Sequence, residues 1–291
     1  MISEFIQYLE VEKRMSSHTV VAYKKDIDLF LDFLDVNELS EIKDINYQNV
    51  RAWIVQLVEQ GNSNRTVNRK LSSLRTFFKW AKKFNHIDVD PMLRVKGPKQ
   101  EKRIPEFVKE DELKVAELNQ LFFDDFFGLR DRLLIEVLYQ TGIRLSELIN
   151  LKAESLQNNA IKVLGKRNKE RMIPITENLN NQLQEYLKNK VYIGYNSNFL
   201  FLTDKGNQMY PNFVYRKVKR YLSLITNLKK RSPHVLRHTF ATHMLNNGAG
   251  LEVLKEVLGH ADLSATQVYT HNSFEQIKKI YKQAHPRGTD K

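Results

Sequence analysis

The chain has 291 residues, of which 42% are hydrophobic and 27% charged, and this ordinary globular composition argues against a disordered or fibrous protein. Its 46 Lys and Arg residues outnumber 34 Asp and Glu residues, and the resulting charge of +12 favours a polyanionic partner such as nucleic acid. Because cysteine is absent, disulfides and thiolate chemistry are excluded, and because no apolar run approaches the ~18 residues that span a bilayer, we expect a cytoplasmic protein.

Four amphipathic helices are expected in residues 1–97, which we assign to a helical DNA-binding domain. Apolar residues recur every three or four positions near the N-terminus, after Ser16, around Trp53 and over residues 64–83. The fourth helix carries basic residues largely outside its apolar stripe, and these are candidate phosphate contacts: Arg65, Arg69, Arg75 and Lys79. A basic face that is merely solvated would give the same pattern, so this alternative stays open.

The second half of the chain combines helices with a short hairpin. A basic stretch with Gly97, Pro98 and Pro105 lacks apolar periodicity and predicts a linker over 98–106, before a second domain at 107–291. Helices are expected around 110–118 and 129–140, and two strands, 161–164 and 171–175, flank the polar hairpin GKRNKE. A third strand is predicted at 199–202. The helix that follows contains candidate DNA contacts Arg216, Lys217, Lys219 and Arg220.

Three segments contain the side chains that phosphoryl transfer requires. They are TGIRLSEL with Arg144, GKRNKER with Lys166, and the stretch from SPHVLRH to QVYTH with His234, Arg237, His260 and Tyr269. A helix that begins at Pro233 would place His234 and Arg237, three residues apart, on one face. Gly259 occupies a position where a left-handed residue ends a helix, so His260 is expected at a chain reversal, where functional side chains often lie.

These segments resemble the tyrosine recombinase (phage integrase) family, and specifically its Xer-type site-specific recombinases. The likeness covers nearly the whole chain, and four separated motifs match in order. The resemblance implies that Arg144 and Arg237 hold the scissile phosphate and that His234 and His260 complete its cradle. The hairpin lysine is Lys166. The nucleophile is Tyr269.

The same resemblance implies a fold, a partner and a reaction. The fold would be mainly α, with an N-terminal four-helix, SAM-like core-binding domain and a mostly helical catalytic domain that contains a small antiparallel β-sheet. The protein would close around double-stranded DNA as a homo-oligomer, or as a hetero-tetramer with a second recombinase on paired sites. The product would be a 3′-phosphotyrosine, and neither ATP, a metal ion nor another cofactor would be needed.

The chemistry of the side chains agrees with these roles. Two guanidiniums can donate bidentate hydrogen bonds to the charge that develops on the phosphate oxygens. A tyrosine has an ordinary pKa near ~10, so Tyr269 needs a proton acceptor, for which His234 is the candidate. Lys166 at a hairpin tip suits a general acid that protonates the leaving 5′ oxygen.

Several residues also have ordinary structural explanations. Arg144 alone would be an ion-pair partner of Glu147 at i+3, and Tyr269 alone a core tyrosine. His234 and His238 have a spacing that zinc sites use, but Val235 replaces the glutamate of the HExxH motif.

The hairpin departs from the family's usual Gly-Lys-Gly, because Gly165-Lys166 is followed by Arg167, which adopts a positive φ less readily than glycine. Arg167 and Lys169 are further candidate DNA contacts.

We expect the biological task of an Xer-type enzyme, which is chromosome dimer resolution. Three other functions remain open. They are a mobile-element integrase with the same chemistry, a non-catalytic architectural DNA-binding protein, and a metal-dependent nuclease. The chain lacks an extra N-terminal arm-binding domain, which favours the Xer-type role. The C-terminal helix, at 274–283, has an apolar face with Ile277, Ile280 and Tyr281 that suits either docking on a neighbouring protomer or packing on its own domain.

Overall fold

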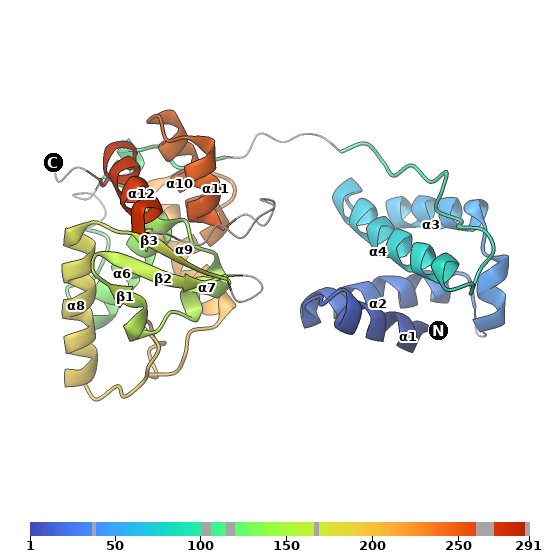
Figure 1. Cartoon of the computed structure of the whole chain (residues 1–291), viewed down its shortest axis with the longest axis horizontal. Helices are drawn as coiled ribbons and strands as arrows, with labels where there is room; N and C mark the ends of the chain where they lie inside the picture. The colour runs from blue at the N-terminus through green and yellow to red at the C-terminus, as the bar shows by residue number, and fades with distance from the viewer. Residues whose placement is uncertain (37–38, 101–105, 115–119, 166–168, 260–270, 289–291) are drawn as a thin grey trace. The chain divides into compact units, whose positions relative to one another are not determined.

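The computed structural model describes residues 1–36, 39–100, 106–114, 120–165, 169–259 and 271–288. The chain divides into two compact units, Met1–Arg103 and Ile104–Lys291, and each has its own hydrophobic core (Figure 1). The predicted linker, 98–106, overlaps this division, and most of it lies outside the described residues. Within the described ranges, no helix has both the length and the apolar character that a membrane span needs.

In its described residues, the first unit contains four α-helices, as the apolar periodicity predicts. They are α1 (Ile2–Gln7), α2 (Ser17–Phe33), α3 (Tyr47–Glu59) and α4 (Asn64–Lys83). A π-helical turn (Tyr8–Glu12) continues α1, and a 3-10 turn (Leu39–Asp44) precedes α3. Ser16 and Ser63 cap α2 and α4, because each hydroxyl accepts a hydrogen bond from a backbone N–H of the first turn. Aromatic side chains fill the core between the helices, among them Phe5, Phe30, Trp53, Phe77 and Phe78.

Helix α6 (Phe126–Thr141) is the centre of the second unit. Every residue from 133 to 141 is buried, so the helix is covered on all sides, which agrees with its nearly continuous apolar sequence. Helices α8 (Glu177–Tyr192) and α10 (Pro233–Asn246) pack against it. The other helices in the described part of this unit are α7 (Leu145–Ile149), α9 (Pro211–Ile225), α11 (Leu251–Leu258) and α12 (His271–Ala284), together with 3-10 turns at Asp111–Leu113 and Ala153–Ser155.

A three-stranded antiparallel sheet covers part of this helical core. Its order is β1 (Leu156–Gln157), β2 (Ala160–Leu164) and β3 (Glu170–Pro174), with Val163 opposite Arg171 in the β2–β3 hairpin. A 2.8 Å hydrogen bond from the backbone N–H of Gly165 to the carbonyl of Lys169 closes the hairpin below its tip. The prediction of a mainly α fold with a small antiparallel sheet is therefore confirmed.

Two local predictions differ from the structure, and one helix was not predicted. The segment predicted as a strand at 199–202 forms only isolated bridges, Lys152 to Phe199 and Leu202 to Gln208, and the third strand is β1 instead. Its apolar run reflects burial in the core, which periodicity alone cannot distinguish from a strand. The helix expected at 110–118 begins as a 3-10 turn, and residues 115–119 lie outside the described residues. Helix α8 was not predicted as a separate element.

The C-terminal helix packs on its own unit. Ile277 and Tyr281 of α12 are buried, and the helix contacts α10 and β3 (Figure 1). Beyond it, Arg287 pairs with Glu136 of α6 at 3.0 Å. The sequence left two uses open for this helix, docking on a neighbouring protomer and packing on its own domain. In the structure of the single chain, the helix packs on its own domain.

Candidate active site

Two predicted phosphate-binding residues, Arg144 and Arg237, meet at the carboxyl end of α11. Arg144 Nη2 donates a hydrogen bond of 3.0 Å to the carbonyl of Gly259, and Arg237 Nη2 donates one of 2.9 Å to the carbonyl of Leu258. Arg237 Nη1 also donates a hydrogen bond of 2.6 Å to the carbonyl of Gly142, just before Arg144. Although they are far apart in the sequence, the two guanidiniums therefore bind consecutive carbonyls at one helix end.

Glycines at two helix ends make room for this arrangement. Gly142 ends α6 with φ 59°, and Gly259 ends α11 with φ 65°, in the left-handed conformation that favours glycine. A Cβ at position 142 would collide with the ring of Phe240, and one at position 259 would lie 3.1 Å from Arg171 Nη1. The absence of a side chain at Gly142 therefore leaves room for Phe240, and its absence at Gly259 lets Arg171 pack close to the end of α11.

A third arginine and a glutamate complete the cluster. Glu147, in α7, accepts hydrogen bonds from the backbone N–H and from Nη1 of Arg144, at 2.8 and 2.9 Å. It also accepts two from Arg171 of β3, at 3.1 and 2.8 Å, while Arg171 Nε donates one of 2.8 Å to the carbonyl of Val257. The carbonyls of Val257, Leu258 and Gly259 thus each accept from a different arginine.

The sequence pattern did not indicate a role for Arg171, and it predicted Glu147 only as an ion-pair partner of Arg144. A signal was nevertheless present. Arg171 alternates with Ile173 on the buried face of β3, and a charged residue at an inward-facing strand position requires a buried partner. The identity of that partner depends on long-range folding, which a local pattern does not contain.

The cluster carries excess positive charge. Burial, followed by the charge of Arg144, lowers the pKa of Arg237 to about 10; Arg171 acts in the same direction and Glu147 opposes it. Burial alone would raise the pKa of Glu147, but hydrogen bonds and charge from Arg171, and then from Arg144, outweigh it and lower that pKa. Three guanidiniums thus share one carboxylate among the described residues, and the negative end of the α11 dipole offsets only part of the difference.

This arrangement can bind an oxyanion. A guanidinium has five N–H donors, and the contacts found within the described ranges use two nitrogens of Arg144 and two of Arg237. Donors therefore remain for phosphate oxygens. A phosphate would also supply the negative charge that the cluster lacks.

The other predicted catalytic residues have different positions. His234 lies in the first turn of α10, one turn before Arg237, and its side chain is exposed. His238 is half-buried one turn later, whereas His243 is a core residue whose Nδ1 lies 2.9 Å from the hydroxyl of Tyr139. Among the described His, Asp and Glu side chains, no group of three is placed to hold a metal ion. Lys166, His260 and Tyr269 lie outside the described residues.

Four tyrosines of the second unit belong to its core. Burial raises the pKa of Tyr221 to about 12, and it also raises the pKa values of Tyr139, Tyr186 and Tyr281. A nucleophilic tyrosine must lose its proton as it attacks, so these raised pKa values are unfavourable for that role. The hydroxyl of Tyr139 lies 2.9 Å from His243 Nδ1, and that of Tyr221 donates a hydrogen bond of 3.0 Å to Asp131.

Apart from Arg69, whose contacts are given below, six candidate DNA contacts are exposed: Arg65 and Lys79 on α4, Lys169 beside the hairpin tip, and Arg216, Lys219 and Arg220 on α9. Arg167 lies outside the described residues. Arg216 donates a hydrogen bond of 3.0 Å to the hydroxyl of Tyr210, which a phosphate contact would have to replace. An exposed basic side chain without such a bond can reach a phosphate directly.

Three further candidates already have partners within the chain. Arg69 forms a bidentate pair with the buried carboxylate of Asp26, with one hydrogen bond of 2.9 Å. Arg75 donates a hydrogen bond of 3.0 Å to the carbonyl of Val95. Lys217 lies 2.7 Å from Asp131. These contacts fix α4 and α9 in place, so binding DNA through these side chains would compete with packing.

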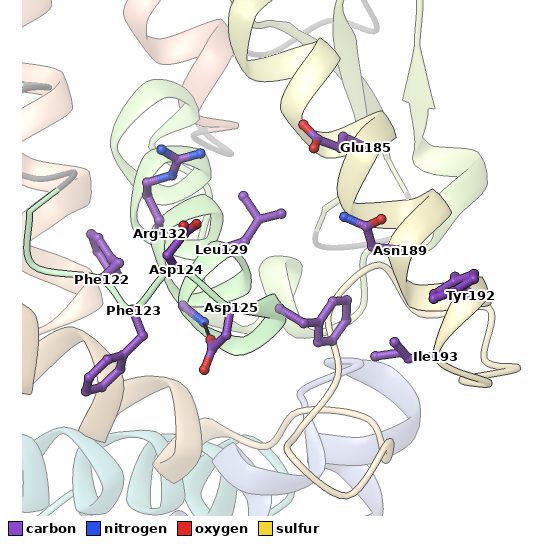
Figure 2. Close-up of a pocket in the computed structure, with 12 residues that line it drawn as sticks. Phe122, Phe123, Asp124, Asp125, Leu129, Arg132, Glu185, Asn189, Tyr192 and Ile193 are labelled. Atoms are coloured by element: carbon purple, nitrogen blue, oxygen red, sulfur yellow. Dashed lines mark hydrogen bonds between the residues drawn. The ribbon is translucent and has the colours of Figure 1, made fainter.

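A surface pocket lies between the start of α6 and the end of α8. Figure 2 shows its lining, with Phe122 and Phe123 on one side and Glu185, Asn189 and Tyr192 on the other; its volume is about 510 Å³. Acidic side chains at its rim make it unsuitable for a phosphate. No residue of the arginine cluster lines it, so this pocket is separate from the candidate active site.

Two family models match the chain. The model described as the phage integrase family matches residues 106–276, and the model described as the phage integrase N-terminal SAM-like domain matches residues 2–85. The first match includes Arg144, Glu147, Arg171 and Arg237.

Relatives along the whole chain have recombinase names. The chain is 35% identical to tyrosine recombinase XerD of Staphylococcus epidermidis over 99% of both chains. It is 36% identical to tyrosine recombinase XerC of Oceanobacillus iheyensis, over 99% of this chain and 96% of the relative.

Two solved structures have a similar fold. The XerH site-specific recombinase bound to palindromic difH substrate, in a post-cleavage complex, has a TM-score of 0.72 and 22% identity, over 96% of this chain and 83% of that chain. The Tn1549 transposon integrase in complex with circular intermediate DNA has a TM-score of 0.70 and 20% identity, over 94% and 98%. At these identities, the two structures establish the likeness of fold alone.

Proposed function

We propose that this chain, which belongs to the phage integrase family, is a tyrosine recombinase that cuts and rejoins double-stranded DNA at specific sites. The observation that carries the proposal is the convergence of Arg144 and Arg237 at the end of α11, in a cluster short of negative charge. A phosphodiester of DNA supplies that charge.

In this proposal, the two guanidiniums hold the non-bridging oxygens of the scissile phosphate. The hydroxyl oxygen of Tyr269 attacks phosphorus, with His234 accepting its proton, and the bond from phosphorus to the 5′ oxygen breaks. Lys166 protonates the leaving oxygen, and His260 completes the phosphate cradle. Each well-placed donor to the developing charge typically contributes about 2.7–4 kcal/mol to the transition state.

The covalent product is a 3′-phosphotyrosine together with a free 5′-hydroxyl. Attack on that phosphotyrosine by the 5′-hydroxyl of a partner strand restores a phosphodiester and releases Tyr269. One phosphate ester replaces another at each step, so the reaction needs neither ATP nor another source of energy, and the proposal includes no metal ion.

We assign the chain an Xer-type role, with chromosome dimer resolution as its biological task and the cytoplasm, where bacterial DNA lies, as its location. Relatives named XerD and XerC match along almost the whole chain, which favours this role over that of a mobile-element integrase. Strand exchange requires paired sites, so we propose that the protein acts as an oligomer, alone or with a second recombinase.

The test is capture of the covalent intermediate. Duplexes that the protein binds are selected from a random-sequence DNA pool, and the selected sequence is then rebuilt with a nick beside the cleavage position, so that the cleaved end diffuses away. We expect the wild-type chain to form an adduct with this DNA that survives denaturation. Tyr269→Phe should form none, whereas Tyr192→Phe, which changes an exposed tyrosine outside the cluster, should form it normally.

The alternatives give different results. A non-catalytic architectural protein would bind the selected DNA without any adduct. A metal-dependent nuclease would release both ends without a protein attached and would stop in EDTA. An adduct that persists in EDTA and disappears in Tyr269→Phe would leave only the recombinase reaction.

A further inference from the structure

Arg171 connects three elements around the candidate active site. Its two Nη atoms bind both carboxylate oxygens of Glu147 in α7, and its Nε binds the carbonyl of Val257 in α11. The residue itself belongs to β3, the second strand of the hairpin. The side chains of Arg171 and Glu147 are each only 5% exposed, so solvent does not weaken this ion pair.

The partners of Arg171 are themselves attached to residues of the proposed mechanism. Glu147 binds both the backbone and the guanidinium of Arg144. The carbonyls of Leu258 and Gly259, which follow Val257, bind Arg237 and Arg144. One guanidinium therefore supports the arrangement that positions the other two.

Two glycines lie against the same guanidinium. A Cβ on Gly165 would lie 3.3 Å from Arg171 Nη1, and one on Gly259 would lie 3.1 Å from it. In the sequence, Gly165 directly precedes Lys166, and Gly259 directly precedes His260. The backbone therefore passes close to Arg171 immediately before two further residues of the proposed mechanism.

We propose that Arg171 is a positioning residue for DNA cleavage, holding Glu147, Gly165 and Gly259 in one geometry around the phosphate site. This inference rests on the proposed function and adds to it a residue that does not contact the substrate. Arg171 acts through Arg144, which it orients by way of Glu147, and through the two chain reversals that pack on its guanidinium.

The geometry requires arginine rather than any cation. The planar guanidinium binds a carboxylate with two parallel bonds while its Nε donates in a third direction. A lysine would keep the positive charge beside Glu147, but its single ammonium could not match the carboxylate fork and still reach the carbonyl of Val257. Arg171→Lys therefore retains the positive charge beside Glu147 and loses the planar geometry of the guanidinium.

The experiment compares Arg171→Lys with Arg130→Lys. Arg130 is also a buried, ion-paired arginine of the second unit, but its partners are Asp131 and Asp204. Single-turnover adduct formation on the selected nicked duplex is measured at saturating DNA, with the dissociation constant for the intact duplex and the melting temperature measured in parallel. We expect Arg171→Lys to form adduct about 10–100-fold more slowly with an unchanged dissociation constant. Arg130→Lys should form it at the wild-type rate when folded.

The results separate the two proposals. If the wild-type chain forms no adduct, the proposed function fails and the inference about Arg171 fails with it. If wild type forms the adduct and Arg171→Lys forms it equally fast, only the positioning role is overturned. A loss of rate shared equally by Arg130→Lys would also overturn it, because any weakened ion pair would then have the same effect. A melting temperature near that of wild type excludes simple unfolding of Arg171→Lys.

Discussion

Among the described residues of the second unit, the cluster around Arg130 and the cluster of Arg144, Arg171 and Arg237 differ in charge balance. Around Arg130, which is fully buried, Asp131 and Asp204 lie 2.7 and 2.6 Å away, and Lys217 also pairs with Asp131. Two cations thus meet two carboxylates. In the cluster of Arg144, Arg171 and Arg237, Arg144 and Arg171 pair with Glu147, and no second carboxylate pairs with the cluster among the described residues.

The pKa shifts of the two clusters have opposite directions. Burial alone would lower the pKa of Arg130, but the charge and hydrogen bonds of Asp131, and then Asp204, outweigh it and raise that pKa. At Arg237, burial and the neighbouring guanidinium of Arg144 lower the pKa. A balanced cluster serves folding, whereas an unbalanced one keeps positive charge available for a ligand. This difference is the reason why we propose the second cluster as the phosphate-binding one.

The largest expected effect is on catalysis, from Arg237→Met. The substitution removes a guanidinium that binds the phosphate in the proposed mechanism, so adduct formation at saturating DNA should fall by about 10²–10³-fold. The loss of two hydrogen bonds is offset by removal of a poorly compensated buried charge, so the free energy of unfolding should change little. Single-turnover trapping and urea denaturation measure the two quantities.

Arg130→Met is the matched control for that comparison. It leaves the carboxylates of Asp131 and Asp204 without their shared cation, and breaking a buried pair typically destabilises a protein by about 3–5 kcal/mol. Adduct formation per folded molecule should stay at the wild-type rate. If Arg237→Met instead lost stability and Arg130→Met lost catalysis, the assignment of the two clusters would be reversed.

A smaller effect is expected from a pair of glycine substitutions. Gly248 and Gly259 both have positive φ, 87° and 65°, so alanine at either position should destabilise the chain by about 1–2 kcal/mol. No atom lies within 4 Å of a Cβ at Gly248, whereas at Gly259 the guanidinium of Arg171 would have to move. Only Gly259→Ala should slow adduct formation, on the order of tenfold, because a small displacement of catalytic groups is costly. Equal rates for both variants would mean that the site tolerates movement of Arg171.

Local patterns predicted much of the fold. The apolar stripe of α4, the β2–β3 hairpin and the glycine at the end of α11 are each visible within a few residues of sequence. The strand predicted at 199–202 failed because its apolar run is buried without pairing along a neighbour. Strand formation depends on a partner, and a partner distant in sequence leaves no local trace.

The same limit applies to the site. Family resemblance named Arg144 and Arg237, and the structure brings them to one helix end, but neither spacing nor resemblance indicated that Arg171 would join them. The sequence also does not distinguish two lysines of α9 that differ in the structure. Lys219 is exposed, whereas Lys217 pairs with Asp131. The burial of a side chain and its ion-pair partners depend on contacts between distant segments. One basic residue of a helix can therefore hold the fold together while its neighbour is available for DNA.

The smallest expected effect is stabilisation by inorganic phosphate. An anion that fills the unbalanced cluster binds the folded chain alone, and at a phosphate concentration equal to the dissociation constant it should add about 0.4 kcal/mol to the free energy of unfolding. The melting temperature should therefore rise with phosphate at constant ionic strength, in wild type and in Arg130→Lys, but not in Arg237→Met. Because added chloride screens surface charges in all three proteins equally, it serves as the reference salt. A phosphate response that survives in Arg237→Met would place the anion elsewhere and remove the charge argument for the site.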